Sequence, residues 1–481
     1  MPALVRSVIL ALPFFIAVQA EAVAQAAITV TPTSLSPTKT ITVTGSGFAA
    51  SEAVDVYLDT TDMQLLVSSS AGAVSGAITV PASASPGKHY VTLVGRRVGD
   101  AAQAAVTIST PWLQLGFGAA KLGLNPFENT LDRNSAPTLG QLWSVSFNAA
   151  GSTPVVSNGY VYVTGAAPGI QKIAAATGTV LWSKLPGSIV YGSAALANGT
   201  VFVADNAGTL YALSSGSGAT LWSDPLGAII YSSPTVVNQT VYIATSAGVF
   251  YAISTTTGAI QWSVNIGSLI DGSAAVVNGV VYFGAYNGYI YALNAATGTQ
   301  LWAYHTGGAI ESTPVIASGI LYVGCDDSHL YALRAVSGGL LWSVSIGGYV
   351  YTPPAVAKGV VYASSENGYL YALDRRNGAV LWTFLPDSYP RSAAVANGVI
   401  YLTSNGGGFY ALDAASGAAL FYGLSGSGFL GGPAVTDGVV YVNGQGVGVS
   451  AYAPLAGNAV SPPRAPRINA LRPDYSLKEK R

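Results

Sequence analysis

Six residues that could bind a ligand recur at steps of 40 residues along the chain. They are Tyr191, Tyr231, Asp271, Glu311, Tyr351 and Arg391. Tyrosine rings offer flat stacking surfaces with a polar tip. A carboxylate pair favours a cation, a sugar hydroxyl or a basic side chain, and mutual repulsion should raise one pKa unless Arg391 or solvent relieves it. We expect these side chains to form a funnel that binds a ligand or a partner.

The sequence around these six positions is monotonous by comparison. Small residues follow five of them directly: Gly192, Ser232, Gly272, Ser312 and Thr352. Ser152 and Leu430 hold the same phase at the two ends of the series. A position that varies while its neighbours stay similar is not set by packing alone. The alternative is that the ring of side chains only plugs and caps a channel, because a shared scaffold does not fix where function sits.

Few other residues could take part in catalysis or bind a metal. The three histidines, His89, His305 and His329, have no metal-ligand spacing. Asp326-Asp327 with His329 resembles an acidic turn, since a cation site needs more ligands. Cys325 is the single cysteine, so an intrachain disulfide is excluded and a buried filler is expected. We expect no catalytic residue and no metal site.

A periodic series of tryptophans predicts the elements that position the six residues. Each of the six lies nine residues after one member of a periodic series. The series is Trp143, Trp182, Trp222, Trp262, Trp302, Trp342 and Trp382, with Leu420-Phe421 at the next step. A fixed period of this size predicts stacked or radial copies of one supersecondary unit.

Each copy predicts four short antiparallel strands. In residues 341–381 they are 341–344, 354–357, 360–363 and 369–374, separated by turns such as Lys358-Gly359 and Asn367-Gly368. Asn-Gly and Asp-Gly recur at the Lys358-Gly359 position and supply the positive φ angles of two-residue hairpins. Eight copies of the first three strands occur, but only seven Trp or Phe strands follow them. The Trp143 strand should therefore complete the last blade, giving an all-β, eight-bladed β-propeller closed by its N-terminal strand.

Composition divides the rest of the chain. Residues 1–26 read as a secretory signal with an apolar run after Arg6, and residues 27–109 as a small β-sandwich. Residues 110–140 are expected to link it to the propeller at 141–453, and residues 454–481 form a disordered basic tail. The net charge of −1 gives no case for nucleic-acid binding. No later segment reads as transmembrane, and a secreted, periplasmic or cell-surface location is expected.

Two family resemblances follow from these motifs. The pattern Tyr-Ala-Leu-(Asp/Asn/Ser)-x-x-x-Gly-x-x-Leu-Trp, clear from Tyr371 through Gly378 to Trp382, resembles the PQQ-like (quinoprotein-type) β-propeller repeat. The resemblance implies that each Trp docks between neighbouring blades and that the Gly makes the preceding hairpin. The stretch from Gly45 through Phe48 to residues 56–58, with Pro86-Gly87 later, resembles bacterial Ig-like (IPT/TIG-type) modules, which act as spacers or adhesive units.

The propeller family includes PQQ-dependent dehydrogenases and non-catalytic scaffolds. Many of the dehydrogenases use two adjacent, disulfide-linked cysteines, Ca²⁺ and a catalytic Asp, and the lone Cys325 excludes the disulfide. We therefore expect an exported, non-catalytic, monomeric scaffold without a cofactor, binding an envelope protein or polysaccharide. The alternative is a PQQ-dependent quinoprotein oxidoreductase of minimal form, with calcium. A third reading is a polysaccharide-acting enzyme that uses the carboxylate pair.

Overall fold

The computed structural model describes residues 25–456, apart from positions 98, 147, 150, 151, 168, 426, 427, 430 and 445–447. Residues 1–24 of the predicted signal and 457–481 of the predicted tail lie outside this part, so both stay predictions. The chain divides into two compact units, and the main boundary between them in the sequence lies near residue 108. Among the described residues, no helix has the length and apolarity that a membrane crossing requires.

The first unit is a β-sandwich of two sheets. One sheet has the order β1-β3-β6 and the other the order β2-β8-β7-β4-β5. The strands are β1 (Ala27–Thr31), β2 (Ser34–Leu35), β3 (Thr40–Ser46), β4 (Ala53–Leu58), β5 (Thr61–Val67), β6 (Val74–Thr79), β7 (Gly87–Gly95) and β8 (Ala101–Ile108). Alternate residues of β3, such as Ile41 and Val43, are fully buried, which is the period-2 pattern of a sheet with one inner face.

In its described residues, the second unit consists of short strands, antiparallel except where β9 pairs in parallel with β36, and one 3₁₀ turn, η1 (Ala136–Thr138). It begins with β9 (Leu124–Asn125), β10 (Leu139–Val145) and β11 (Asn148–Ala149). The next blades are β12 (Val155–Ser157), β13 (Tyr160–Ala167), β14 (Ile170–Ala174), β15 (Val180–Lys184); β16 (Ala195–Ala197), β17 (Thr200–Ala204), β18 (Thr209–Ser214), β19 (Thr220–Pro225); β20 (Thr235–Val237), β21 (Thr240–Ala244), β22 (Val249–Ser254), β23 (Ile260–Asn265). They continue with β24 (Ala275–Val277), β25 (Val280–Gly284), β26 (Tyr289–Asn294), β27 (Gln300–His305); β28 (Val315–Ala317), β29 (Ile320–Gly324), β30 (His329–Arg334), β31 (Leu340–Ser345). The last are β32 (Ala355–Ala357), β33 (Val360–Ser364), β34 (Leu370–Asp374), β35 (Val380–Phe384); β36 (Ala394–Ala396), β37 (Val399–Thr403), β38 (Gly408–Asp413), β39 (Ala419–Leu424); β40 (Ala434–Thr436), β41 (Val439–Gly444), β42 (Gly448–Pro454).

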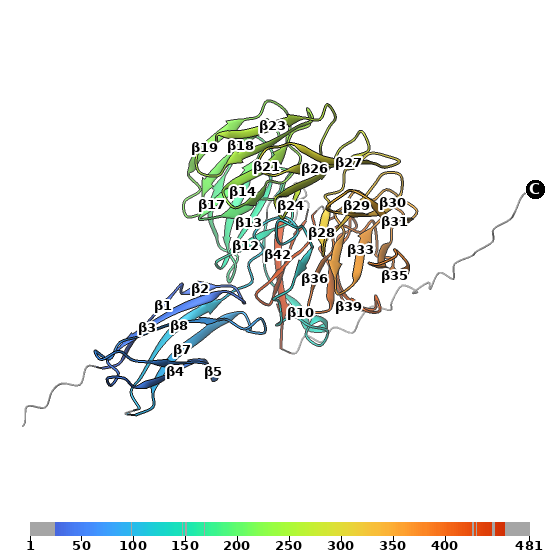
Figure 1. Cartoon of the computed structure of the whole chain (residues 1–481). Coiled ribbons are helices and arrows are strands. Elements are labelled where there is room, and N and C mark those ends of the chain that lie inside the picture. The colour runs from blue at the N-terminus through green and yellow to red at the C-terminus, as the bar shows by residue number, and fades with distance from the viewer. Residues whose placement is uncertain are drawn as a thin grey trace, which may run out of the picture. The chain divides into compact units, whose positions relative to one another are not determined.

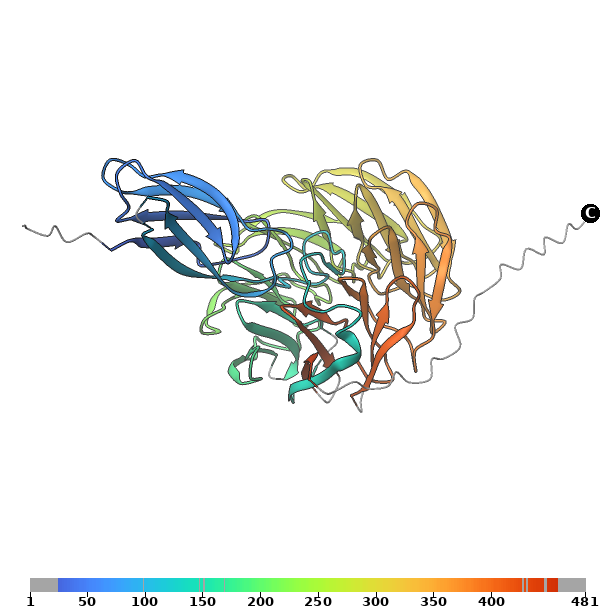
Figure 2. The same cartoon turned by 90° about the horizontal axis from the view of Figure 1, so that it is seen from below.

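These strands form consecutive sheets of the type β20-β21-β22-β23, arranged around a common centre (Figures 1 and 2). The innermost hairpin of each sheet has a two-residue turn. In the turn Asn278-Gly279, φ is +51° and +77°, the doubly positive geometry that a type I′ turn requires. Lys358 adopts φ +45° at the same position before Gly359, although its side chain is not one that favours this region.

The ring is closed by strands from the two ends of the unit. β10 pairs antiparallel with β42, for example Trp143 with Ala451, and completes the sheet β10-β42-β41-β40. The innermost strands contact one another in sequence from β12 to β40, and β40 contacts β12. Closure by an N-terminal strand is therefore as the sequence predicted, and it removes the open edge of a linear array.

Neighbouring blades are held together by a tryptophan on a glycine. The Trp262 indole N–H donates to the carbonyl of Ala295 in the next blade over 3.0 Å. The Gly298 Cα lies against the same indole, so that an added Cβ would be 2.7 Å from Cε3. The hydroxyl of Tyr242 donates to the same Ala295 carbonyl. The equivalent glycines under the other indoles are Gly178, Gly218, Gly258, Gly338, Gly378 and Gly417.

Gly298→Ala should therefore destabilise the propeller more than Gly279→Ala. Both glycines have similar positive φ angles, but a Cβ at Gly279 meets nothing within 4 Å. The strain of a left-handed alanine, about 1 kcal/mol, is common to both variants. Overpacking against Trp262 should add roughly 1–3 kcal/mol in Gly298→Ala alone. Denaturant unfolding of the two variants measures the difference, and equal losses would contradict the docking role.

Candidate functional site

An axial segment, residues 112–125, runs along the inner edges of the blades. Its Leu122 carbonyl accepts the N–H of Val356 in β32, and its Asn125 side-chain amide donates to the carbonyl of Val435 in β40. Other inner-strand N–H groups bonded to the segment belong to Val156, Leu196, Val236, Val276, Ile316 and Val395. Residues 110–140 were expected to be a linker. The segment also satisfies backbone groups that would otherwise be buried without partners around the axis.

The six sequence-predicted funnel residues line one cavity of about 260 Å³, defined here as the funnel. Each precedes the innermost strand of its blade, which is why successive copies converge at one end of the channel. The rings of Tyr191 and Tyr231 contact each other with centroids 5.8 Å apart, and each residue is 37% exposed. Leu115 of the axial segment also lines the cavity. The structure thus brings all six together, while their binding role stays a proposal.

A ladder of hydroxyls explains why the flanking residues are small. The N–H of Thr153 donates to Ser193 Oγ over 2.9 Å, and the N–H of Ser193 donates to Ser233 Oγ over 2.9 Å. The same contact continues through Ser273 to Thr313. The inner strands approach so closely that a Cβ on Gly192 would be 2.8 Å from the Ser232 carbonyl oxygen. Among the residues just before the inner strands, the funnel positions are therefore the ones that can accept side chains of different size.

One wall of the funnel is acidic. Burial, followed by repulsion from Glu311, raises the pKa of Asp271 to about 6, and a hydrogen bond from Tyr286 offsets only part of this. The Tyr286 hydroxyl also donates to Glu311 Oε1 over 2.6 Å. Burial and then repulsion from Glu311 and Glu366 raise the pKa of Asp326 to about 6. Among the described residues, no cation contributes to the raised pKa values of Asp271 and Asp326, so their repulsion from Glu311 is not offset by a positive charge.

Arg391 lies on a different wall. Its Nη1 donates to the Tyr351 hydroxyl over 3.0 Å, and its guanidinium carbon is 5.9 Å from the centroid of the Tyr351 ring. Its other donors go to the Asn405 side chain and the Phe429 carbonyl. Arg391 is not among the groups that shift the pKa of Asp271. The guanidinium is thus committed to its own neighbours and leaves the acidic wall uncompensated.

A second tier of variable residues was missed by the sequence reasoning. It comprises Asn206, Ser246, Tyr286, Asp326, Glu366 and Asn405, which follow the second strand of their blades. Tyr286 and Asn405 contact the funnel residues Glu311 and Arg391 directly. Their spacing of 40 residues, with one step of 39, is the signal that could have found them. Asp326 lies in the turn after β29, as expected, and its carboxylate is repelled by that of Glu311 in the funnel.

The neighbouring turn residues have a structural role. The Asp327 carboxylate accepts the Tyr331 hydroxyl over 2.5 Å and the N–H groups of Gly307 and His329 over 3.0 Å each. Cys325 is fully buried, and burial raises the pKa of its thiol to about 11. Ser152 is buried and accepts a hydrogen bond from Asn443, away from the funnel. Leu430 lies outside the described residues.

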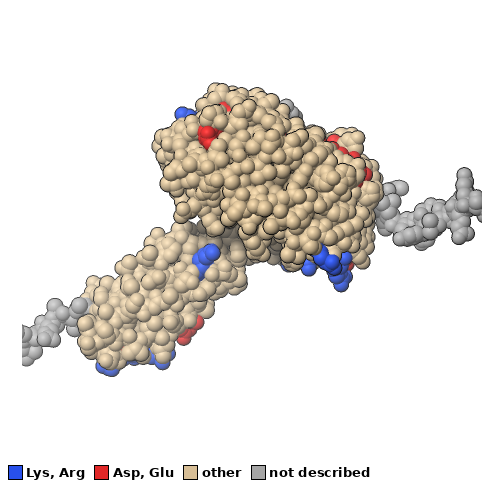
Figure 3. All heavy atoms as spheres, turned by 45° about the horizontal axis from the view of Figure 1, so that its top comes forward, with Lys and Arg blue, Asp and Glu red and all other residues tan. Residues whose placement is uncertain are grey.

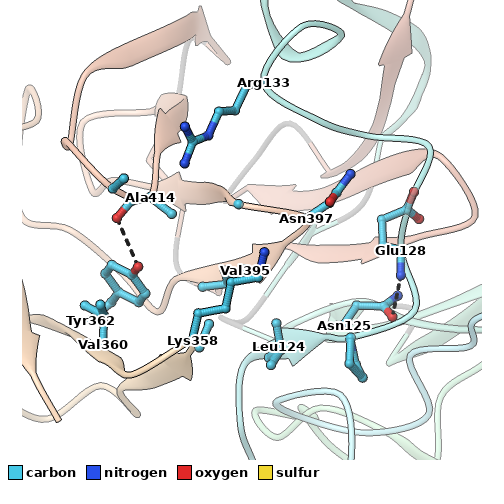
Figure 4. A pocket seen from close by; sticks show the side chains of 14 residues that line it. Leu124, Asn125, Glu128, Arg133, Lys358, Val360, Tyr362, Val395, Asn397 and Ala414 are labelled. Atoms are coloured by element: carbon cyan, nitrogen blue, oxygen red, sulfur yellow. Dashed lines mark hydrogen bonds between the residues drawn. The ribbon is translucent and has the colours of Figure 1, made fainter. Parts of the chain in front are cut away.

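A larger groove of about 390 Å³ lies at the other end of the innermost strands (Figure 4). There Tyr362 donates its hydroxyl to the Ala414 carbonyl over 3.1 Å, beside Lys358 and Asn397. The same groove recurs around Tyr162, with Asn158, Asn198 and Ser215 in the equivalent places. Because it repeats with the blades, we attribute this groove to blade geometry rather than to a specific ligand.

Comparison with known proteins fits this geometry. The family model described as outer membrane protein assembly factor BamB matches residues 129–190, 184–309, 286–393 and 386–460. The chain belongs to this family of PQQ-like repeat propellers. A model described as the IPT/TIG domain matches residues 28–109. No curated protein sequence matches the chain.

Solved structures share the propeller fold at low identity. BamB from Moraxella catarrhalis is 16% identical, with a TM-score of 0.59, over 66% of this chain and 99% of that one. Quinohemoprotein alcohol dehydrogenase from Comamonas testosteroni is 16% identical, with a TM-score of 0.62, over 71% of this chain and 80% of that one. The computationally designed Ika8 protein is 18% identical, with a TM-score of 0.60, over 65% of this chain and 100% of that one. Such identities establish the fold alone.

The funnel residues do not fit a quinone with calcium. PQQ is a tricarboxylate, and Asp271 and Glu311 would repel it. Within the described residues, no three His, Cys, Asp or Glu side chains come together as metal ligands. Cys325 is the single cysteine and lies in the core between β29 and β30, so no adjacent pair can face a quinone ring. We therefore derive no redox step from this site.

Asp271→Asn should stabilise the protein in a pH-dependent manner. The folded-state pKa of about 6 lies above the ordinary value of 3.8. The contribution of Asp271 to stability is therefore full below pH 3.8 and is lost as the pH rises through about 6. At pH 8 the variant should gain up to about 3 kcal/mol over the wild type.

The matched control is the same variant at pH 3.5, where the native carboxyl is protonated in the folded state and mostly protonated in the unfolded state. Thermal unfolding followed by circular dichroism at the two pH values gives the comparison. An equal gain in melting temperature at both values would show that the effect is steric rather than electrostatic.

Proposed function

We propose that the protein is an exported, non-catalytic binding propeller of the cell envelope, and that its funnel accepts a basic side chain of a protein partner. The observation that carries this proposal is the meeting of six blade-specific side chains in one cavity of about 260 Å³. The residue type at this equivalent position varies between blades, whereas the scaffold around it is otherwise uniform. Ligand-binding pockets are typically concave and lined by polar and aromatic groups that converge in this way.

The charge distribution favours a cation over a neutral ligand. Glu311 repels both Asp271 and Asp326, and burial followed by this repulsion raises the pKa of each aspartate to about 6. A bound ammonium or guanidinium would favour the ionised carboxylates. A sugar hydroxyl would accept or donate hydrogen bonds but would leave this repulsion unrelieved.

The aromatic wall is compatible with the same ligand. Tyr191 and Tyr231 present half-exposed rings to the cavity, and cations are attracted to such ring faces. The face of the propeller that Figure 3 shows carries few charges, in keeping with 9% charged residues in the whole chain. A local acidic cavity on a weakly charged surface gives selectivity to one entering group rather than general attraction.

The envelope assignment draws on three further observations. Residues 1–26 have the pattern of a secretory signal. The matching family is described as an outer membrane protein assembly factor. The matched IPT/TIG domain at residues 28–109 would serve as a spacer or adhesive unit in front of the propeller.

A hexalysine peptide should bind the full chain, and the double variant Asp271→Asn/Glu311→Gln should bind it about 10- to 100-fold more weakly. Loss of charged hydrogen-bond partners of this kind is worth about 1.5–3 kcal/mol. Isothermal titration calorimetry at pH 7.5 measures the affinities, with hexaglutamate as the peptide of opposite charge. A panel of neutral oligosaccharides tests for a glycan ligand and for its cleavage.

Two tyrosine variants provide a matched control. Tyr231 and Tyr289 are equally exposed at 37%, but only Tyr231 lines the funnel. Tyr231→Ala should weaken peptide binding several-fold, whereas Tyr289→Ala should not. Unchanged hexalysine affinity in the double carboxylate variant would refute the proposal. Oligosaccharide binding that the double variant abolishes would assign a glycan instead.

A further inference from the structure

A small inner cavity lies directly beneath the funnel. Leu115, Thr153, Pro353, Ser392 and Gly432 line both spaces, so that they form the floor of one and the roof of the other. The inner cavity leaves about 20 Å³ for the centre of a water-sized guest. This is enough for one small occupant with polar partners.

Two residues that line this cavity carry hydrogen-bond donors without an acceptor. Lys121 and Trp112 of the axial segment line it, and each is only 1% exposed. Within the described part of the chain, neither Lys121 Nζ nor Trp112 Nε1 has a hydrogen-bond partner. Both groups only donate, so the missing occupant must accept. Leaving such buried groups unpaired is costly, and for an ammonium far more so than for an indole.

The backbone holds the lysine in place at a further cost. Lys121 has φ +60°, which is unfavourable for a residue with a Cβ. Its N–H donates to the Gly118 carbonyl, and the N–H of Gly123 donates to the Gly116 carbonyl. The carbonyl of neighbouring Ala120 accepts the N–H of Ile316 in β28. A strained residue fixed by its surroundings is a recurrent mark of a functional site.

Lysine at this position is not neutralised by a carboxylate. Burial alone lowers the pKa of Lys121 to about 7, with no contribution from any charged side chain. The polar side chains among the lining residues are the hydroxyls of Thr153 and Ser392, besides the two donors. When Lys121 is protonated, none of these lining side chains balances its positive charge.

We propose that the inner cavity is a binding site for a small monovalent anion of the halide class, held by Lys121 Nζ and Trp112 Nε1. The anion supplies the negative charge and the acceptor that the two donors lack. The site is independent of the partner proposed for the funnel, whose ligand is a cation.

The test is the thermal stability of the full chain in sodium bromide against sodium gluconate at constant ionic strength. An ion that binds only the folded state raises the melting temperature with its concentration. The wild type should gain several degrees as bromide replaces gluconate, and more at pH 6 than at pH 8.5, because the anion pairs with the protonated amine. Lys121→Met should melt at the same temperature in both salts, whereas Lys88→Met in the sandwich should respond like the wild type.

A second variant and a direct measurement cover the case that Lys121→Met does not fold. Trp112→Phe keeps an aromatic ring but removes the N–H, and it should reduce the apparent bromide affinity about tenfold. Crystals grown in bromide should show an anomalous peak within hydrogen-bonding distance of Lys121 Nζ. An equal response of the wild type and Lys121→Met, or the absence of that peak, would overturn the proposal and leave the cavity to water beside a neutral amine.

Discussion

Burial of one blade face against the next is the constraint on which the propeller depends. A four-stranded sheet of short strands cannot bury both faces by itself, so each blade needs a neighbour on either side. The indole of Trp262 over Gly298 fixes the distance between two blades, and the carbonyl of Ala295 fixes the orientation through bonds from Trp262 and Tyr242. Stacked rings such as Phe250 and Phe283, with centroids 4.5 Å apart, fill the space between the blades. Repetition of this contact leaves little freedom in the curvature of the ring.

Most of the fold follows from local signals in the sequence. The tryptophan period predicts the blades, the Asn-Gly pairs predict the inner hairpins, and the unmatched Trp143 strand predicts the closure with β42. The axial segment could not be predicted in this way, because it does not repeat and because it bonds to backbone N–H groups such as that of Val356. Backbone partners leave no signature in side-chain type. Lys121 was overlooked for the same reason, since nothing in its local sequence marks a lysine for burial.

The candidate site was predictable where equivalent positions in successive repeats of the chain could be compared. Asp271 and Glu311 stand out because the glycines and serines beside them barely change between copies. The second tier escaped notice because Asp326 was judged as a turn residue, although Tyr286 and Glu366 hold the same phase. The pairing of Arg391 with Tyr351 and Asn405, rather than with a carboxylate, required coordinates. Sequence periodicity identifies which positions converge, but it does not show which of their side chains form hydrogen bonds with each other.

The pairing of β10 with β42 has a consequence for biosynthesis. Translation delivers residues 139–145 long before their partner strand at 448–454 exists. At roughly 5–20 residues per second, the interval of about 300 residues lasts on the order of 15–60 s. During this time the first-made edge is an unsaturated template for any passing strand. The nascent chain therefore cannot complete its ring until residues 448–454 have been made, and its first blades remain without their closing partner during this interval.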